Sequence, residues 1–180
     1  MPLLRLNKVS LAYGHRALLD QVDLDVHRGE RVCLVGRNGE GKSSLMRVLG
    51  GEVQVDDGEC WVRPGMRIAY LAQEVGMDSH DSVFDVVAAG LSDLGKLISD
   101  YHHAAKQLEQ SDSPANLQRL SDLQQSLEAA NGWQLEQRVE TVLSRLQLDS
   151  DAEFHSLSGG WRRRVMLARA LVCDPDVLLL

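Results

Sequence analysis

A glycine-rich segment near residue 40 constrains the fold of this chain more than any other feature. Residues 36–43 read Gly-Arg-Asn-Gly-Glu-Gly-Lys-Ser and fit the pattern G-x-x-x-x-G-K followed by Ser or Thr, which is typical of phosphate-binding loops. Glycines let the backbone of such a loop approach an anion closely, because no Cβ stands in the way. The backbone N–H groups of the loop and the positive end of the following helix then form an anion site.

The residues on either side of this segment predict the strand and helix that a phosphate loop requires. The apolar run Val32–Val35 precedes the loop and is typical of a strand that is buried on both faces. A helix is expected to begin near Gly41 and to stop at Gly50. In this arrangement Lys42 can reach the β- and γ-phosphates of a nucleotide, and the Ser43 hydroxyl can ligate Mg²⁺.

Composition narrows the class of protein further. The 180 residues are enough for one domain with a real core, and the 44% hydrophobic and 25% charged content is ordinary for a soluble globular protein. The net charge of −7 gives no general attraction to nucleic acid. Three widely spaced cysteines favour a reducing compartment over a disulfide scaffold. Since neither a signal pattern nor a bilayer-length apolar run is present, we expect a cytoplasmic protein.

Alternating apolar residues predict strands in the first 71 residues. Leu4–Leu11 is expected to form an amphipathic edge strand, and Val22–Val26 a half-buried strand. The turn residues Asp56–Glu59 separate two short strands. A further strand is predicted over Ile68–Leu71, and Gln73 follows it closely.

The spacing of apolar residues along the sequence changes from Ser82 onward. Apolar residues recur three or four positions apart as far as Leu146, which predicts a series of amphipathic helices. Ser113 and Pro114 are suited to the N-cap and first position of one of them. The leucine rows are best interpreted as packing faces. We therefore expect a helical insertion between two α/β segments, without a second independent core.

A Ser-Gly-Gly turn follows the region of predicted helices. Ser158, Gly159 and Gly160 precede a helix predicted over Arg162–Val172, and an apolar strand is predicted over Val177–Leu180. Such a helix N-terminus favours an anion, although an ordinary helix cap has the same sequence pattern. The arginines at positions 162, 163 and 164 are expected to form a solvated helix face rather than a nucleic-acid site.

The order of these motifs resembles that of the ATP-binding cassette ATPases over the whole chain. A phosphate loop (Walker A), Gln73 after a strand, Leu-Ser-Gly-Gly before a helix and Asp-Pro-Asp-Val-Leu-Leu-Leu follow one another as in that family. Trp161 replaces the glutamine that usually ends the signature, and with Tyr70–Glu74 and Trp133–Glu136 it is similar to the first cassette of the ABC-F group. The resemblance implies the α/β P-loop NTPase fold of a cassette domain, with a mixed sheet and a helical arm.

The same resemblance implies roles for particular residues. Lys42 and Gln73 would be catalytic, Ser43 and Gln73 would contact Mg²⁺, and Tyr13 would stack on adenine. A core-packed tyrosine and a strand-end amide bonded to backbone are the alternatives for Tyr13 and Gln73. The implied ATP-binding residues are Tyr13, Gly36, Arg37, Asn38, Gly39, Glu40, Gly41, Lys42, Ser43 and Ser44. The implied signature residues, which would meet a nucleotide held by a second cassette, are Leu157, Ser158, Gly159, Gly160 and Trp161.

The resemblance also implies a domain division and a larger protein. Residues 1–82 would form the nucleotide-binding core, residues 83–146 the helical arm, and residues 147–180 the signature, its helix and the start of the Walker B strand. The Walker B Asp and Glu and the second cassette would lie beyond Leu180, so we expect an N-terminal fragment that binds ATP weakly and hydrolyses little of it.

The implied parent is a cytosolic ATPase that uses ATP and Mg²⁺, has two cassettes and no membrane domain, and acts on ribosomes and translation. Some members of the group are also associated with DNA binding and transposon excision, here through a missing C-terminal region. Two alternatives stay open. One is the ATP-binding subunit of a membrane transporter, which shares the motifs, and the other is a non-catalytic nucleotide-binding or DNA-associated module.

Overall fold

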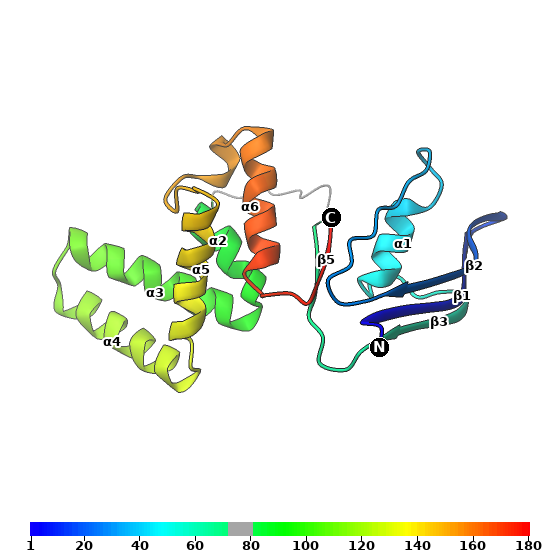
Figure 1. The fold of residues 1–180 in the computed structure, drawn as a ribbon. Coiled ribbons are helices and arrows are strands. Elements are labelled where there is room, and N and C mark those ends of the chain that lie inside the picture. Colours follow the sequence, from blue (N-terminus) through cyan, green and yellow to red (C-terminus); the bar gives the residue numbers. More distant parts are fainter. Residues whose placement is uncertain (72–80) are drawn as a thin grey trace. The chain divides into compact units, whose positions relative to one another are not determined.

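The computed structural model describes residues 1–71 and 81–180, which fall into two compact units. The first unit comprises Met1–Tyr70 with Pro175–Leu180, and the second comprises Leu71–Asp174. Figure 1 shows the strands and helix α1 in the first unit and helices α2 to α6 in the second. The mixed α/β fold class predicted from the sequence is confirmed. The division at residues 82 and 146 stays a prediction.

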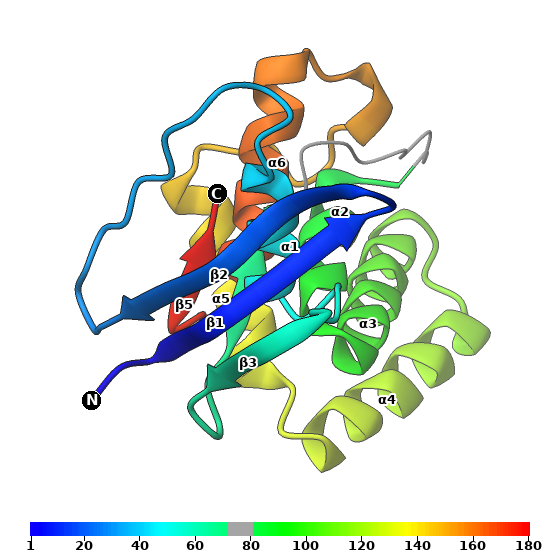
Figure 2. The ribbon, with the colours of Figure 1, turned by 90° about the vertical axis from the view of Figure 1, so that its right-hand side faces the viewer.

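A three-stranded antiparallel sheet forms one layer of the first unit. Strand β1 (Leu4–Tyr13) lies between β2 (Arg16–Val26) and β3 (Asp57–Val62), as Figure 2 shows. The expectation of an edge strand at β1 is therefore wrong, because two later segments both pair with it. Lys8, at φ 48°, interrupts the register of β1 against β2 between Leu6 and Val9. This irregularity returns the apolar side chains after it to the buried face.

Helix α1 (Lys42–Leu49) and a parallel strand pair complete the first unit. Strands β4 (Ile68–Tyr70) and β5 (Val177–Leu179) form where the sequence predicted strands, and the structure pairs them with each other over their full length. The apolar face of α1 shares one core with the sheet and with β5. Its buried members include Leu4, Leu6, Val9, Leu11, Leu45, Val48, Leu49, Val177 and Leu179.

The strand predicted over Val32–Val35 does not form. Residues 27–37 have no regular secondary structure, and the side chains of Val32 and Val35 are 50% and 91% exposed. An apolar run becomes a buried strand only where neighbouring strands supply its backbone hydrogen bonds. Among the described residues, the three ladders do not reach this segment.

The second unit is helical, as the spacing of apolar residues predicted. Ser113 caps α4, because its hydroxyl oxygen accepts a hydrogen bond from the Asn116 N–H at 3.2 Å, and Pro114 occupies the first turn. The elements are α2 (Val83–Ala88), η1 (Ala89–Leu91), α3 (Asp93–Gln110), α4 (Pro114–Ala129), α5 (Trp133–Arg145), η2 (Phe154–Ser156) and α6 (Gly159–Leu171).

The helical unit has a hydrophobic core of its own, which corrects the expectation of an insertion without one. Helix α2 packs against α3, α5 and α6, and every one of these helices contributes buried side chains. Gly90 permits the close approach of α6, since a Cβ at this position would lie 2.3 Å from the Arg169 carbonyl oxygen. The core residues include Phe84, Val86, Val87, Ile98, Leu127, Val139, Leu143, Val165 and Val172. Among the described residues, no helix is both long enough and apolar enough to cross a membrane.

A half-buried histidine that stacks on this core is expected to make the stability of the unit dependent on pH. The His102 ring stacks on the Phe84 ring, with 3.9 Å between centroids, and its buried Nε2 has no hydrogen-bond partner within the described part of the chain. Burial, and then the charges of Lys106 and His103, hold the pKa of His102 below its ordinary value, although Asp85 and Glu140 act in the opposite direction.

We expect the free energy of unfolding to fall as the pH is lowered from about 7.5 to about 5.5. The unfolded chain binds a proton near the ordinary histidine pKa, whereas folded His102 resists protonation, so its contribution is complete above that pKa and is lost below it. Urea unfolding followed by circular dichroism measures the effect. The fall should shrink in His102→Phe and persist in His15→Gln, which alters an exposed histidine. If the free energy of unfolding of His102→Phe fell with pH as steeply as that of the original chain, the assignment of this pH dependence to His102 would be contradicted.

Candidate functional site

Two glycines shape the end of the phosphate loop. Gly39 and Gly41 have φ values of 83° and 84°, in the left-handed region that favours glycine. Gly41 is the N-cap of α1, and its carbonyl accepts the first helical hydrogen bond from the Leu45 N–H at 2.8 Å. A Cβ on Gly41 would lie 2.8 Å from the Leu18 carbonyl oxygen of β2. The helix therefore begins where the sequence predicted, and the tight turn before it requires glycine.

Lys42 folds back across the loop that precedes it. Its Nζ donates hydrogen bonds to the carbonyl oxygens of Gly36 and Arg37, both at 2.7 Å. These two bonds connect the start of the loop to the first residue of α1. The positive charge of the lysine is consequently held at the loop, where a phosphate group would need it.

Ser43 and Ser44 occupy the first turn of α1. The side chain of Ser43 is exposed and that of Ser44 is half-buried. The residues described contain no group of three or more His, Cys, Asp or Glu that could hold a metal ion. Mg²⁺ is commonly held by one or two protein oxygens, substrate phosphates and water. The exposed Ser43 hydroxyl fits the role of a single protein ligand to magnesium that arrives with a nucleotide.

Tyr13 lies next to the turn of the hairpin formed by β1 and β2. Its side chain is 57% exposed, so the alternative of a core-packed tyrosine is wrong. Tyr13 pairs with Arg16 across the hairpin, and Leu18, two residues further along β2, contacts Gly41 of the loop. This places the hairpin end beside the loop and leaves the ring free to stack. Gln73 falls outside the described residues, so its role stays a prediction.

The signature residues begin helix α6 in the second unit. Ser158 is the N-cap by backbone geometry, but its hydroxyl makes no capping hydrogen bond. Ser158, Gly159 and Gly160 are exposed, and a Cβ on either glycine would meet no atom within 4 Å. An ordinary side-chain cap therefore does not explain this serine. The open turn is compatible with binding an external group, which stays a prediction.

Two of the three arginines that follow the signature lie over aromatic rings. The Arg164 guanidinium lies 4.4 Å from the centroid of the Trp161 ring, and the Arg162 guanidinium lies 5.9 Å from that of Phe154. Trp161 itself is 42% exposed. All three arginines at positions 162–164 are exposed, in agreement with the predicted solvated face. Leu157 packs against the core of the helical unit and anchors the turn.

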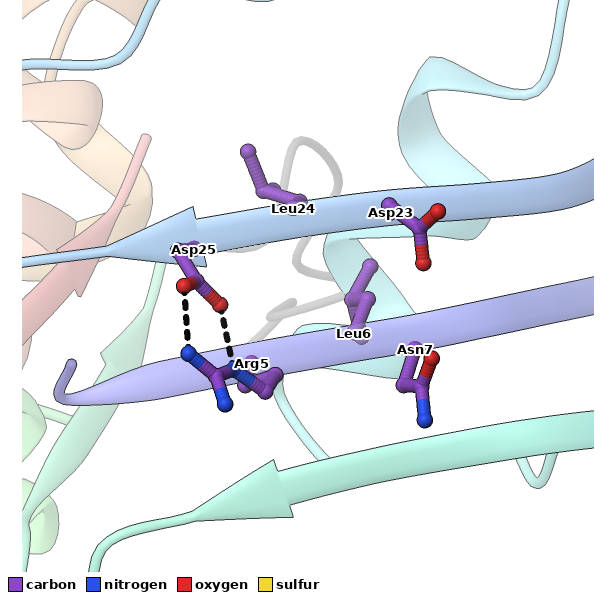
Figure 3. A pocket seen from close by; sticks show the side chains of 6 residues that line it. All are labelled: Arg5, Leu6, Asn7, Asp23, Leu24 and Asp25. Carbon is purple, nitrogen blue, oxygen red and sulfur yellow. Dashed lines mark hydrogen bonds and ion pairs between the residues drawn. The ribbon is translucent and has the colours of Figure 1, made fainter.

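A shallow pocket on the sheet is separate from the phosphate loop. Figure 3 shows Arg5 and Asp25 facing each other across β1 and β2. The Arg5 guanidinium donates two hydrogen bonds to the Asp25 carboxylate, at 2.7 and 2.6 Å, and these bonds lower the pKa of Asp25. Asp23 in the same pocket accepts the Lys8 N–H at 2.8 Å. Because these charged groups are already partnered, the pocket offers no reactive group.

One contact within the loop could not be predicted from the sequence. Glu40 was expected at the nucleotide site only as a member of the motif, but its carboxylate accepts a hydrogen bond from the Arg37 N–H of the same loop at 2.7 Å. The only signal for this contact is a carboxylate placed in the middle of an anion-binding loop.

The loop, helix and signature define the class of protein to which the chain belongs. Residues 19–180 match the family model described as "ABC transporter", and the chain belongs to this family of ATP-binding cassettes. Among curated proteins, the chain is 41% identical over 180 residues to the ATP-binding protein Uup of Haemophilus influenzae and 40% identical to Uup of Escherichia coli. It is 30% identical over 176 residues to the energy-dependent translational throttle protein EttA of Mycobacterium tuberculosis. The predicted resemblance to ABC-F cassettes is confirmed.

These relatives are much longer than the chain. The alignment covers 100% of the chain but 28% of each Uup protein, and 97% of the chain but 32% of EttA. Solved structures show the same fold. A nucleotide-free ATP-binding cassette from an ABC transporter has a TM-score of 0.69 and 22% identity, and the match covers 99% of this chain and 68% of that one. An ATP-binding subunit of an ABC transporter has a TM-score of 0.67 and 20% identity, over 98% and 64% of the two chains.

Proposed function

We propose that the chain binds ATP with Mg²⁺ at residues 36–44 and forms part of the first cassette of a longer, Uup-like ABC-F ATPase. The observation that carries the proposal is the position of the Lys42 ammonium, held at the loop carbonyls beside two left-handed glycines and the start of α1. A cation, the backbone N–H groups of a glycine-rich loop and a helix N-terminus together match what a triphosphate requires.

Each part of the loop has a distinct task in this proposal. The N–H groups at the start of α1 hold the phosphates, and Lys42 exchanges its bonds with the loop carbonyls for bonds to the β- and γ-phosphate oxygens. Ser43 contributes one oxygen to Mg²⁺, which neutralises phosphate charge when bound. Gln73 would orient the attacking water, and Ser158 and Gly160 would face a nucleotide on a second cassette.

A role in translation is the best-supported activity for the whole protein. EttA, which is 30% identical to the chain, is named as a translational throttle. We therefore propose the ribosome as a partner of the parent protein in the cytoplasm, with DNA as a further partner of Uup-like members. The alternative of a transporter subunit is supported by the fold, but the identity to those cassettes is 20–22%, against 40–41% to Uup. The 180 residues alone are expected to hydrolyse little ATP.

Calorimetric titration of the 180-residue chain with Mg-ATP, ADP and AMP tests the nucleotide site. ATP and ADP should bind and AMP should not bind measurably, because AMP lacks the β-phosphate that the loop recognises. Equal affinity for AMP would place recognition elsewhere, and the proposal would be removed if ATP bound neither to the chain nor to any variant with a substitution in the loop.

Tyr13→Ala should weaken ATP binding by about 5- to 150-fold, the value of one aromatic–base stack of about 1–3 kcal/mol. Pyrophosphate binding should be unchanged, because the ring is expected to contact adenine alone. Tyr13→Phe is the matched control and should bind ATP as the original chain does, since it keeps the ring. Equal loss of ATP and pyrophosphate binding in Tyr13→Ala would assign the tyrosine a structural role instead.

A further inference from the structure

The side chain of Glu40 lies against the loop that would hold the phosphates. Its Oε2 accepts a hydrogen bond from the Arg37 N–H at 2.7 Å. The same oxygen lies 2.7 Å from where a Cβ on Gly36 would stand, so the carboxylate fills the space beside this glycine. One backbone donor at the start of the loop is therefore already bonded to an anion that belongs to the chain itself.

The cation of the loop is also engaged internally. Lys42 Nζ donates to the carbonyl oxygens of Gly36 and Arg37, at 2.7 Å each. Side chains from the loop thus occupy both the N–H and the carbonyl of Arg37. A phosphate group that enters the loop must exchange with these contacts, and only Glu40 carries the same sign of charge as the phosphate.

We propose that the Glu40 carboxylate competes with nucleotide phosphates for the loop and thereby lowers its affinity for them. The inference rests on the proposed ATP-binding function and adds a residue that sets the affinity of that site. A carboxylate and a phosphate both accept hydrogen bonds from N–H donors, and they repel each other at short range. When the nucleotide enters, the Glu40 side chain leaves the Arg37 N–H and turns to solvent.

Calorimetric titration of the 180-residue chain with pyrophosphate and with Mg-ATP tests this role. Glu40→Gln removes the charge and keeps the size of the side chain, and Glu40→Ala removes both the charge and the group that accepts the hydrogen bond. Both variants should bind pyrophosphate and Mg-ATP about 3- to 10-fold more tightly than the original chain, because a repulsive unit charge is gone. A variant that merely damages the loop would bind more weakly, so a gain in affinity separates competition from a structural role.

Glu30→Gln is the matched control. Its carboxylate also accepts a hydrogen bond at 2.7 Å from a backbone N–H three residues earlier, that of His27, and the change in net charge is identical. The affinity of Glu30→Gln for pyrophosphate and Mg-ATP should stay within about twofold of that of the original chain, since Glu30 lies outside the loop. An equal gain in Glu30→Gln would assign the effect to net charge and overturn the proposal.

The outcomes also separate this inference from the proposed function. If the original chain binds ATP and the Glu40 variants bind it equally or more weakly, the competition is refuted while the ATP site stands. If only the Glu40 variants bind measurably, both proposals are supported. If neither the original chain nor the variants bind pyrophosphate or ATP, both proposals are overturned.

Discussion

Replacing Lys42 with alanine is expected to weaken binding of Mg-ATP to the 180-residue chain by about 10- to 150-fold, because a hydrogen bond to a charged group contributes about 1.5–3 kcal/mol. Lys42 is the cation that the structure holds at the loop, through the carbonyls of Gly36 and Arg37. The substitution removes both the charge that meets the phosphates and the two bonds that join the start of the loop to α1. In a full-length protein that contains this chain, most turnover at this cassette should be lost as well.

Arg47→Ala provides the matched control for this experiment. Arg47 is exposed in the last turn of the same helix, so its loss changes the net charge equally without touching the loop. Calorimetry should give an affinity of Arg47→Ala for Mg-ATP within about twofold of that of the original chain. Binding by Lys42→Ala that matches that of Arg47→Ala would contradict the assignment of the phosphate site. Thermal unfolding of both variants checks that each is folded.

Replacing Phe84 with alanine should lower the free energy of unfolding of the helical unit by about 3–5 kcal/mol. The Phe84 side chain is 1% exposed, belongs to α2 at the centre of the helical core, and stacks on His102. Truncation removes buried apolar surface and leaves a cavity that the surrounding helices fill incompletely. Urea unfolding followed by circular dichroism measures the loss.

Leu117→Ala is the control for the core substitution. Leu117 is a large apolar residue on α4 of the same unit, but it is 49% exposed. Its truncation should cost less than about 1 kcal/mol, as is usual for surface positions. Similar losses in the two variants would show that Phe84 does not occupy a closely packed core.

Local signals in the sequence were sufficient to predict a structural feature where the atoms that form it lie within a few residues of one another. Gly41 before Lys42 predicted the start of α1, and Ser113 with Pro114 predicted the start of α4. Both depend on backbone conformation and on hydrogen bonds that span three or four residues. The phosphate-loop motif could be recognised for the same reason, because its glycines and lysine act within a single turn of chain.

The direction of the Glu40 side chain could not be predicted, although every atom involved is close in sequence. A glutamate side chain has several rotamers of similar energy, and the choice depends on which donor is free nearby. Here the donor is the Arg37 N–H, which the conformation of the loop exposes to the carboxylate. The motif specifies the glycines and the lysine but leaves this position unrestricted.

The sequence by itself determined the phosphate loop, the helical nature of residues 83–146 and the beginnings of α1 and α4, because these depend on short-range hydrogen bonds and on the spacing of apolar residues. Only the tertiary structure decided that β1 lies between two strands, that Val32 and Val35 stay exposed, and that α6 joins α2 in a second core. Each of these outcomes depends on a partner distant in the sequence. An apolar pattern shows that a segment needs a partner, but the identity of that partner is set by the packing of the whole chain.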